Sequence, residues 1–385
     1  MLNPSLSLAS RYVEQGQLKQ DFMIKFKLYG ILLLVGITIA SCTLLEKNKF
    51  ESVLTFERNL IESKEPEFVC RLSEDSILLG QPKDFTIIND SSFVVVDGRG
   101  AYLYNFEGTL IKQLGDYGQA RGGLISPGHV YATSGLIYIW CKSLMKMLIF
   151  DHNGHFKDEV SNLRIGVMKF FVDSNDEILY FYTNGKFDQS RNNVINVINV
   201  YNIVEDSFTI YGERTNEDEV LSVWNNSGGL YVNSNKLIYL HPGNLILYSH
   251  NLNSDKTVRF KIEDKAFRRN RITNIKKTMD NKRALHDYVM QSSYVRGLYN
   301  DKGHFFIIAD IGSTFDEQDP ESWQKSRKTK LYIFDSSFTP NRSIIYDYIN
   351  SPNIVIYSNA IYFLTLNLDG DDQIINLNRF SLDAE

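Results

Sequence analysis

The chain has 385 residues, of which 43% are hydrophobic and 23% are charged. These fractions are typical of a folded chain with its own core, and they exclude a disordered or collagen-like protein. The formal net charge is −5, so nucleic acid is not an expected partner, because proteins that bind it usually carry a basic surface. The 22 Tyr and 24 Phe favour strands. Three cysteines are too few for a disulfide framework.

A short apolar segment near the N-terminus has the features of a lipoprotein signal peptide. Lys25 and Lys27 precede a mostly apolar run over residues 28–40. A helix that spans a membrane needs about 20 apolar residues, so this run is too short to be one. The run ends in Ile39-Ala40-Ser41-Cys42. This tetrapeptide resembles the lipobox of bacterial lipoproteins, in which small residues precede the cysteine that is lipidated.

We therefore expect residues 1–41 to be a signal peptide and residues 42–50 to be a lipid anchor and tether. Cys42 would carry a diacylglyceryl group on its thiol and a further acyl chain such as palmitate on its amine. We interpret Met23 as the true start of the protein and residues 1–22 as an extension ahead of it. The alternative is that the signal peptide has an unusually long n-region before its apolar run. Thr43 stands where an Asp would favour the inner membrane, so we expect an outer-membrane lipoprotein. A buried helix with an incidental cysteine is the competing interpretation.

A sequence unit recurs through the rest of the chain. An apolar strand ends in Tyr or Phe, followed by Asn, Asp or Ser and a turn. The spacings between successive examples are 46, 51, 47, 86 and 46 residues. Steps of 40–50 residues with about four short strands each are typical of propeller blades. The sequence therefore predicts an all-β, six-bladed β-propeller over residues 51–385. The six examples are Tyr104-Asn105, Phe150-Asp151, Tyr201-Asn202, Tyr248-Ser249, Phe334-Asp335 and Phe380-Ser381.

Two features depart from a simple repeat. The long interval predicts a short helical insertion at about residues 264–293, which holds eight Lys and Arg. The sixth unit ends soon after Phe380, before a fourth strand. Since an unpaired edge strand would be exposed, we expect the N-terminal part of the chain to complete this blade, through either Ser52–Arg58 or Glu67–Leu72.

Several segments resemble the six-bladed β-propeller lipoproteins of gut-type Gram-negative bacteria, which are similar to TolB-like and NHL-like propellers. The glycine-rich segment over residues 115–123 resembles their inter-blade loop. Residues 136–139 and 148–154 resemble the blade that comes next, and residues 294–301 resemble the start of a later blade. The resemblance spans roughly residues 70–385 and implies architecture more than function.

Catalytic and metal-binding patterns are weak. The seven His residues show no metal-ligand spacing, and no nucleophile elbow or phosphate loop is present. We expect no cofactor. Cys70 and Cys141 could pair in an oxidising compartment, but two buried thiols are the favoured interpretation. The candidate ligand-binding residues are Arg121, Trp224, Tyr294 and Arg296, and Tyr231 and Trp323 are further exposed-aromatic candidates.

The sequence leaves two functions open. The first is a lipid-anchored module that binds or scaffolds an envelope protein or an oligosaccharide, because a propeller presents a rigid ring of loops. The second is an envelope carbohydrate-active enzyme, a glycosidase or lyase with acid and base residues at the mouth of the channel. Convergent carboxylates, His or Arg at one mouth would favour the enzyme, and an uncharged mouth would favour the binding module. We favour the first.

Overall fold

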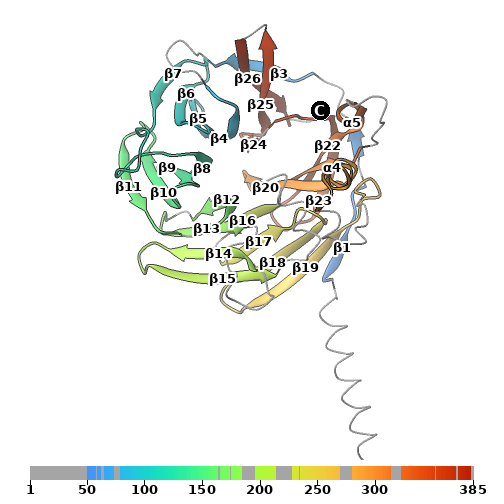
Figure 1. Ribbon diagram of the computed structural model, residues 1–385. Helices are drawn as coiled ribbons and strands as arrows, with labels where there is room; N and C mark the ends of the chain where they lie inside the picture. Colours follow the sequence, from blue (N-terminus) through green and yellow to red (C-terminus); the bar gives the residue numbers. More distant parts are fainter. Residues whose placement is uncertain are drawn as a thin grey trace, which may run out of the picture. The chain divides into compact units, whose positions relative to one another are not determined.

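Six β-sheets surround one axis in the computed structural model (Figure 1). The described residues are 50–57, 59–61, 65–72, 79–163, 165–173, 175–183, 196–213, 228–233, 235–268, 280–313, 322–351, 353–369 and 372–382. The chain divides into Met1–Glu51 and Ser52–Glu385, and all six sheets belong to the second unit. The predicted six-bladed β-propeller is confirmed.

Each blade contains four antiparallel strands, which are named in order from the innermost to the outermost. Blades one to three are β4 (Pro82–Asn89), β5 (Ser92–Asp97), β6 (Ala101–Asn105) and β7 (Leu110–Gln113); β8 (Pro127–Ala132), β9 (Leu136–Cys141), β10 (Lys146–Asp151) and β11 (Phe156–Val160); β12 (Val167–Val172), β13 (Ile178–Thr183), β14 (Asn196–Asn202) and β15 (Ser207–Glu213). Blades four to six are β16 (Gly229–Asn233), β17 (Lys236–Leu240), β18 (Ile246–Asn251) and β19 (Lys256–Ile262); β20 (Tyr294–Asp301), β21 (His304–Ile311), β22 (Lys328–Phe334) and β23 (Pro340–Asp347); β24 (Ile354–Tyr357), β25 (Ala360–Asp369), β26 (Asp372–Ser381) and β3 (Glu67–Arg71).

The core lies between the blades, because each blade packs on a neighbour on both faces. This explains why the second strands are almost uniformly apolar: every residue of β5 is buried. Alternate side chains of β5 belong to different interfaces. Val94 packs in a cluster with Ile139 of blade two, whereas Val95 packs in a cluster with Leu377 of blade six.

The ring closes as predicted, through a strand from the N-terminal part of the chain. β3 pairs with β26 in antiparallel register, with Cys70 opposite Leu377. Of the two candidate segments, Glu67–Leu72 supplies this strand. The alternative, Ser52–Arg58, is wrong for closure, because β1 (Ser52–Leu54) pairs in parallel with β19 of blade four.

The N-terminal part of the chain also covers the outer edges of two blades. After β1, the strand β2 (Asn59–Ile61) pairs in parallel with β23 of blade five. The two short strands satisfy backbone groups that would otherwise be open to edge-to-edge pairing. The sequence predicts a strand in the segment of β1, but for the wrong blade, and it does not predict β2, since a three-residue strand carries no periodicity.

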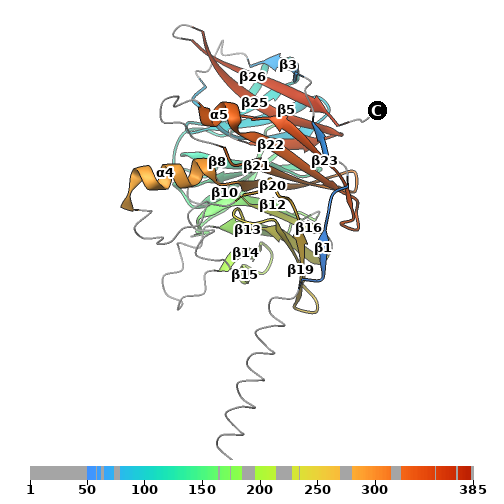
Figure 2. The same cartoon turned by 90° about the vertical axis from the view of Figure 1, so that its right-hand side faces the viewer.

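The predicted insertion between blades four and five contains α4 (Lys282–Gln291), whose first backbone amides are capped by Asn281. Residues 269–279 of the insertion lie outside the described residues. A second, unpredicted helix, α5 (Ser322–Ser326), lies between β21 and β22. Figure 2 shows both helices on one face of the ring. Within the described ranges, no helix is long and apolar enough to cross a membrane.

Cys70 and Cys141 are buried free thiols, as favoured from the sequence. Burial raises the pKa of each to about 11. Both thiols therefore stay protonated at neutral pH, and they behave as small apolar core residues.

Candidate functional site

A pocket of about 490 Å³ lies where the innermost strands of the blades meet. This volume is in the range of small-molecule sites. All six innermost strands, or residues directly beside them, contribute to its lining. The polar and aromatic side chains of this lining include Asp84, His129, Tyr131, Lys169, Phe171, Tyr231, Arg296, Tyr299 and Asn353.

The innermost strands present these side chains through a shared irregularity. Near the start of β4, β8, β12 and β20, a β-bulge leaves one residue without a direct cross-strand partner. A bulge re-aims the side chains next to it. The bulge residues are Lys83, Gly128, Met168 and Arg296, and the residues directly after them are Asp84, His129, Lys169 and Gly297.

We call Asp84, His129, Lys169, Arg296 and Asn353 the polar ring. Further along the innermost strands, a second level of side chains lines the pocket; on β8 and β12 it lies two residues after the polar ring and therefore on the same face. We call its four aromatic members the aromatic wall: Tyr131, Phe171, Tyr231 and Tyr299.

The carboxylate of Asp84 is fully engaged. It accepts from the backbone N–H of Phe85 at 2.9 Å and of Val130 at 3.2 Å. His129 Nδ1 lies 3.3 Å from Oδ2, and the Asn353 side-chain amide donates to Oδ1. Asp84 therefore ties blades one, two and six together, and its oxygens have little capacity left for a ligand.

Lys169 reaches across the axis from blade three to blade five. Its Nζ donates to the backbone oxygen of Arg296 and lies 5.5 Å from the centre of the Tyr299 ring. On β16, Gly229 has no side chain, and a Cβ there would meet Leu298 of β20 at 2.4 Å. This glycine lets β16 and β20 approach closely.

Burial lowers the pKa of Lys169 to about 8; the Asp84 charge opposes the shift, and the Arg296 charge adds to it. An ammonium has three donors. Among the described residues, Lys169 Nζ has a single hydrogen-bond acceptor, the oxygen of Arg296. Two of its N–H groups are thus available to the pocket.

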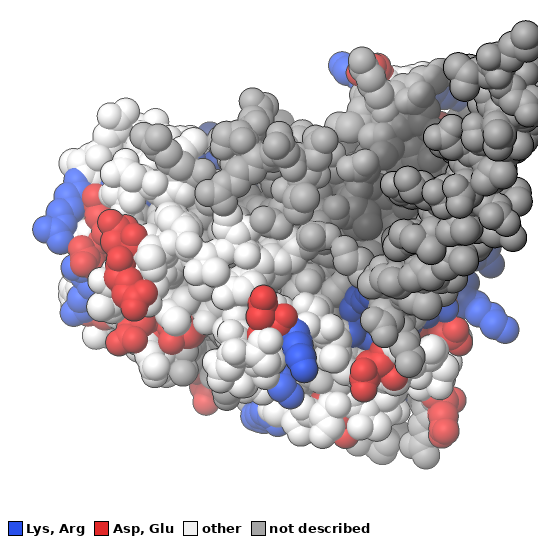
Figure 3. Space-filling model, turned by 90° about the horizontal axis from the view of Figure 1, so that it is seen from below, with Lys and Arg blue, Asp and Glu red and all other residues white. Residues whose placement is uncertain are grey.

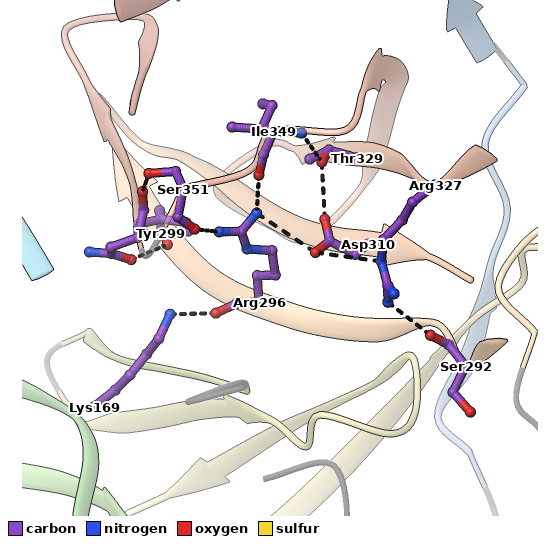
Figure 4. A network of polar contacts seen from close by, with 10 residues as sticks. Lys169, Ser292, Arg296, Tyr299, Asp310, Arg327, Thr329, Ile349 and Ser351 are labelled. Atoms are coloured by element: carbon purple, nitrogen blue, oxygen red, sulfur yellow. Dashed lines mark hydrogen bonds and ion pairs between the residues drawn. The ribbon is translucent and has the colours of Figure 1, made fainter. Parts of the chain in front are cut away.

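Arg296 is held by a buried network (Figure 4). Its Nη1 donates to the Ile349 oxygen at 2.7 Å, and its Nη2 donates to the Ser351 oxygen. The carboxylate of Asp310, which is fully buried, lies 3.7 Å from Nη1. Arg327 lies 4.0 Å from the same carboxylate. Because its guanidinium is occupied on several sides, Arg296 acts mainly by positioning its own backbone oxygen, which holds Lys169.

Three members of the aromatic wall, Tyr131, Phe171 and Tyr231, form a continuous run of rings on three adjacent blades. The ring centres of Tyr131 and Phe171 are 5.1 Å apart, and those of Phe171 and Tyr231 are 5.2 Å apart. Burial raises the pKa of Tyr131, Tyr231 and Tyr299, so all three are neutral donors at physiological pH. Within the described part of the chain, the Tyr131 and Tyr231 hydroxyls have no hydrogen-bond partner, whereas Tyr299 donates to Asn353 at 3.5 Å.

The structure places one of the four predicted ligand-binding residues, Arg296, at the pocket. Tyr294 is buried, with the Arg327 guanidinium 4.7 Å from its ring centre. Arg121 lies away from the pocket, where it pairs with Asp158 at 3.0 Å. Trp224 and Cys42 lie outside the described residues. The further candidate Tyr231 belongs to the aromatic wall, and the side chain of Trp323 is not described.

Sequence patterns missed Asp84, His129, Lys169, Tyr131 and Phe171. The available signal was positional: each lies in the first strand of its unit, just before the turn and apolar run that mark the second strand. In the described ranges, no group of three or more His, Cys, Asp or Glu side chains is placed to hold a metal ion. On the face shown in Figure 3, acidic and basic described side chains are interspersed along the margin.

The fold and the pocket define a six-bladed propeller with a ligand-sized cavity on its axis. No known protein-family profile matches the chain, and no curated protein matches it. It is similar in structure to a Bacteroides fragilis protein described as exported, with a TM-score of 0.56, 14% identity, and 86% and 99% of the two chains covered. It is also similar to a member of the DUF4221 family from Bacteroides vulgatus, with a TM-score of 0.57, 10% identity, and 83% and 97% covered. At these identities the likeness shows the fold alone.

Proposed function

We propose that this protein is a lipid-anchored propeller of the bacterial cell envelope that binds a glycan in its axial pocket. The N-terminal lipobox-like sequence supports the anchor at Cys42, and the exported description of one structural neighbour supports the envelope location. The pocket volume suits a small ligand or the end of an oligosaccharide better than a protein surface.

One observation carries the binding function. Unused hydrogen-bond donors and a run of aromatic rings line the same cavity. The donors are two N–H groups of Lys169 and the hydroxyls of Tyr131 and Tyr231, and the Phe171 ring lies between the two tyrosine rings. A sugar presents oxygen acceptors around its ring and an apolar face of C–H groups. This combination matches a wall that offers both hydrogen bonds and aromatic surface.

The binding function is tested on a glycan array with the full chain purified in detergent. We expect a restricted set of glycans to bind the wild type. Phe171→Ala should lose this binding, because it removes the centre of the aromatic wall. Arg121→Ala is the matched control, since Arg121 is exposed and distant from the pocket, and it should bind as the wild type does. Unchanged binding by Phe171→Ala would place the ligand elsewhere.

The lipid anchor is tested separately by metabolic labelling with a fatty-acid probe. We expect the wild type to incorporate the probe and Cys42→Ala to lose it. Cys70→Ala retains Cys42 and should label normally, which controls for the change of a cysteine as such. Equal labelling of the wild type and Cys42→Ala would reject the anchor.

Eliminative cleavage of an acidic polysaccharide is a second candidate function. Glycoside hydrolysis normally uses two carboxylates, and Asp84 is the one carboxylate among the described residues that line the pocket. A lyase instead needs a base and a neutral proton donor, and Lys169, with a pKa of about 8, lies in the same pocket as neutral tyrosines. Ultraviolet absorbance from a new unsaturated sugar end would detect this activity, and its loss in Lys169→Met would assign it.

A further inference from the structure

We propose that the ligand of the axial pocket is an acidic sugar whose carboxylate binds the Lys169 ammonium and whose ring lies against the aromatic wall. This inference rests on the proposed function and narrows it from a glycan to a monoanionic sugar. Three properties of one cavity support it: its charges, its free donors and its aromatic surface.

The charges around the polar ring do not balance. Three cations line the described part of the pocket, Lys83, Lys169 and Arg296, together with one carboxylate, Asp84. Arg296 has a second carboxylate nearby, since Asp310 lies 3.7 Å from its Nη1. The described lining therefore carries one more positive charge than Asp84 and Asp310 neutralise, and Lys169 is the cation with N–H groups left for a ligand. A single monoanion would neutralise it, whereas a phosphate monoester carries up to two charges and would leave an excess beside Asp84.

The hydrogen-bonding groups point to the same ligand. Lys169 has two unused N–H groups, and the hydroxyls of Tyr131 and Tyr231 lack partners among the described residues. The one carboxylate that lines the described pocket, Asp84, already accepts four hydrogen bonds or close contacts. Lys169 therefore has donors to spare, whereas the one carboxylate in the described lining has little capacity left for a ligand. A ligand with a carboxylate near Lys169 and other oxygens near the tyrosines would provide acceptors for these unused donors.

The aromatic wall distinguishes an acidic sugar from an aromatic acid. Both could place a flat apolar face against Phe171 and a carboxylate near Lys169. An aromatic acid would leave the Tyr131 and Tyr231 hydroxyls facing C–H edges, which loses hydrogen bonds that these groups can otherwise make. The hydroxyls around the edge of a sugar ring both accept and donate hydrogen bonds. A sugar can therefore form hydrogen bonds with the Tyr131 and Tyr231 hydroxyls that an aromatic acid cannot.

Protonation of Lys169 gives the proposal a pH signature. A sugar carboxylate is ionised above roughly pH 4, so the titration near pH 8 belongs to Lys169. About a tenth of Lys169 is protonated at pH 9, and the affinity should fall roughly tenfold between pH 7 and pH 9. The titratable or charged groups of the described residues that line the pocket with Lys169 are Lys83 and Asp84 on β4, His129 and Tyr131 on β8, Tyr231 on β16, Arg296 and Tyr299 on β20, and Tyr357 on β24.

The experiment is isothermal titration calorimetry on the full chain in detergent. The probes are glucuronate, galacturonate and N-acetylneuraminate, with glucose, glucose 6-phosphate and benzoate as comparisons. We expect at least one acidic sugar to bind at pH 7 at least tenfold more tightly than all three comparison compounds. Its affinity should fall roughly tenfold at pH 9. Tyr231→Phe should weaken this binding, because it removes a hydroxyl that the sugar ring would use.

Two variants at position 169 separate charge from structure. Lys169→Met should weaken binding at least tenfold at pH 7. Lys169→Arg keeps a charge that does not titrate, so it should retain binding at pH 7 and lose the decline toward pH 9. Thermal unfolding of each variant checks that the propeller is still folded. If Lys169→Met is misfolded, the pH profile of Lys169→Arg and the affinity of Tyr231→Phe test the inference in its place.

Some outcomes would overturn the inference alone. Equal binding of glucose and the acidic sugars, or a pH profile of Lys169→Arg identical to that of the wild type, would reject the acidic sugar while an axial glycan site stands. Tighter binding of benzoate or glucose 6-phosphate would replace the ligand class. A third outcome is that no probe binds in calorimetry, while on the glycan array the wild type binds neutral glycans and Phe171→Ala does not. In that case the acidic-sugar inference fails and the proposed function holds. If the array is also negative, both fail.

Discussion

Arg379 Nε donates to the Glu67 carboxylate at 2.7 Å, across 312 residues of sequence. The pair joins β26 to β3, the two strands at which the ring closes. Both side chains are about half exposed, so the ion pair itself contributes about 1 kcal/mol or less. The stability of the closure resides instead in the backbone pairing and in buried residues such as Cys70 and Leu72, which lie in the core between blades six and one.

The first prediction separates these contributions. Deletion of residues 43–75, with Cys42 kept, should cause misfolding or aggregation, because it exposes the edge of β26 and opens the core beneath it. Arg379→Ala should change the free energy of unfolding by about 1 kcal/mol or less. Thermal unfolding and size-exclusion chromatography of the two variants measure the contrast.

A shorter deletion serves as the control. Removing residues 43–62 takes away β1 and β2 but keeps β3, so the ring should still close, with a lower unfolding temperature. If the 43–75 deletion instead unfolds as cooperatively as the full chain and at the same temperature, β3 does not contribute to closure in the way its pairing indicates.

The second prediction concerns a buried ion pair beside the N-terminal strands. Lys330 Nζ lies 2.6 Å from Asp264 Oδ2 and donates to Asn59 Oδ1 at 3.0 Å, while Tyr332 donates to Asp264 at 2.6 Å. Asp264→Asn should destabilise the protein by about 3–5 kcal/mol, because it leaves the Lys330 charge buried without a counter-ion. Asn59→Ala removes a neutral acceptor and should cost roughly 1–3 kcal/mol. Urea unfolding at pH 7 measures both; equal losses would contradict the ranking.

The same pair gives an acid dependence. Burial opposes ionisation of Asp264, but the hydrogen bonds from Lys330 and Tyr332 outweigh it, so its pKa is lowered. A carboxylate with a lowered folded-state pKa stabilises the protein above its unfolded pKa of about 4, and this stability is lost as the pH falls further. The acid limb of the stability profile should therefore be shallower in Asp264→Asn. Identical acid limbs would show that other groups control it.

The ring could be predicted from the sequence because its cause is repetitive. Six units each carry a polar turn before an apolar second strand, and that strand is apolar because blades cover both of its faces. The closing strand was predictable from the missing fourth strand after Phe380. The pairing of β1 and the existence of β2 were not predictable, since each strand is only three residues long and is set by the edge that it covers.

The pocket was harder to predict for a different physical reason. Lys169, His129 and Asp84 come from three blades and meet only because bulges near the starts of their strands place them at equivalent positions. A one-residue bulge leaves no mark in an apolar pattern. Arg296 was selected from a segment that resembles a blade start, yet the role that the structure supports for it is to hold Lys169 through its backbone oxygen.

The third prediction concerns Lys169, whose charged form is disfavoured by burial, whereas the charged form of Asp264 is favoured by its hydrogen bonds. Burial lowers the pKa of Lys169 to about 8, below the unfolded value of about 10.4. The folded state therefore binds fewer protons between these values, so the contribution of Lys169 to stability rises with pH above about 8. Lys169→Met should remove this contribution, so the stability of the wild type minus that of the variant should rise with pH. The difference is the relevant quantity, because burial raises the pKa of the Cys70 and Cys141 thiols to about 11, which lowers the stability of both proteins over the same pH range. Urea unfolding between pH 7.5 and about 9.5, below the titration of unfolded tyrosines, measures it; a difference that does not change with pH would show that Lys169 makes no such contribution.

The last prediction concerns two glycines with nearly the same backbone conformation. Gly108 has φ +83° and Gly303 has φ +80°, both in the left-handed region. A Cβ at Gly303 would meet no atom within 4 Å, whereas a Cβ at Gly108 would lie 1.9 Å from the backbone oxygen of Arg71, at the end of the closing strand. Gly303→Ala should therefore cost about 1–2 kcal/mol, which is the strain of the conformation alone.

Gly108→Ala carries that same strain and must also displace the end of β3, which should add about 1–3 kcal/mol. Because the displaced backbone belongs to the closing strand, Gly108→Ala should also increase amide hydrogen exchange along β3 and β26, and Gly303→Ala should not. Urea unfolding gives the energies, and exchange mass spectrometry gives the location. Equal destabilisation by the two substitutions, with no local change in exchange, would show that the first blade and the closing strand can separate without loss, and that closure does not depend on this contact.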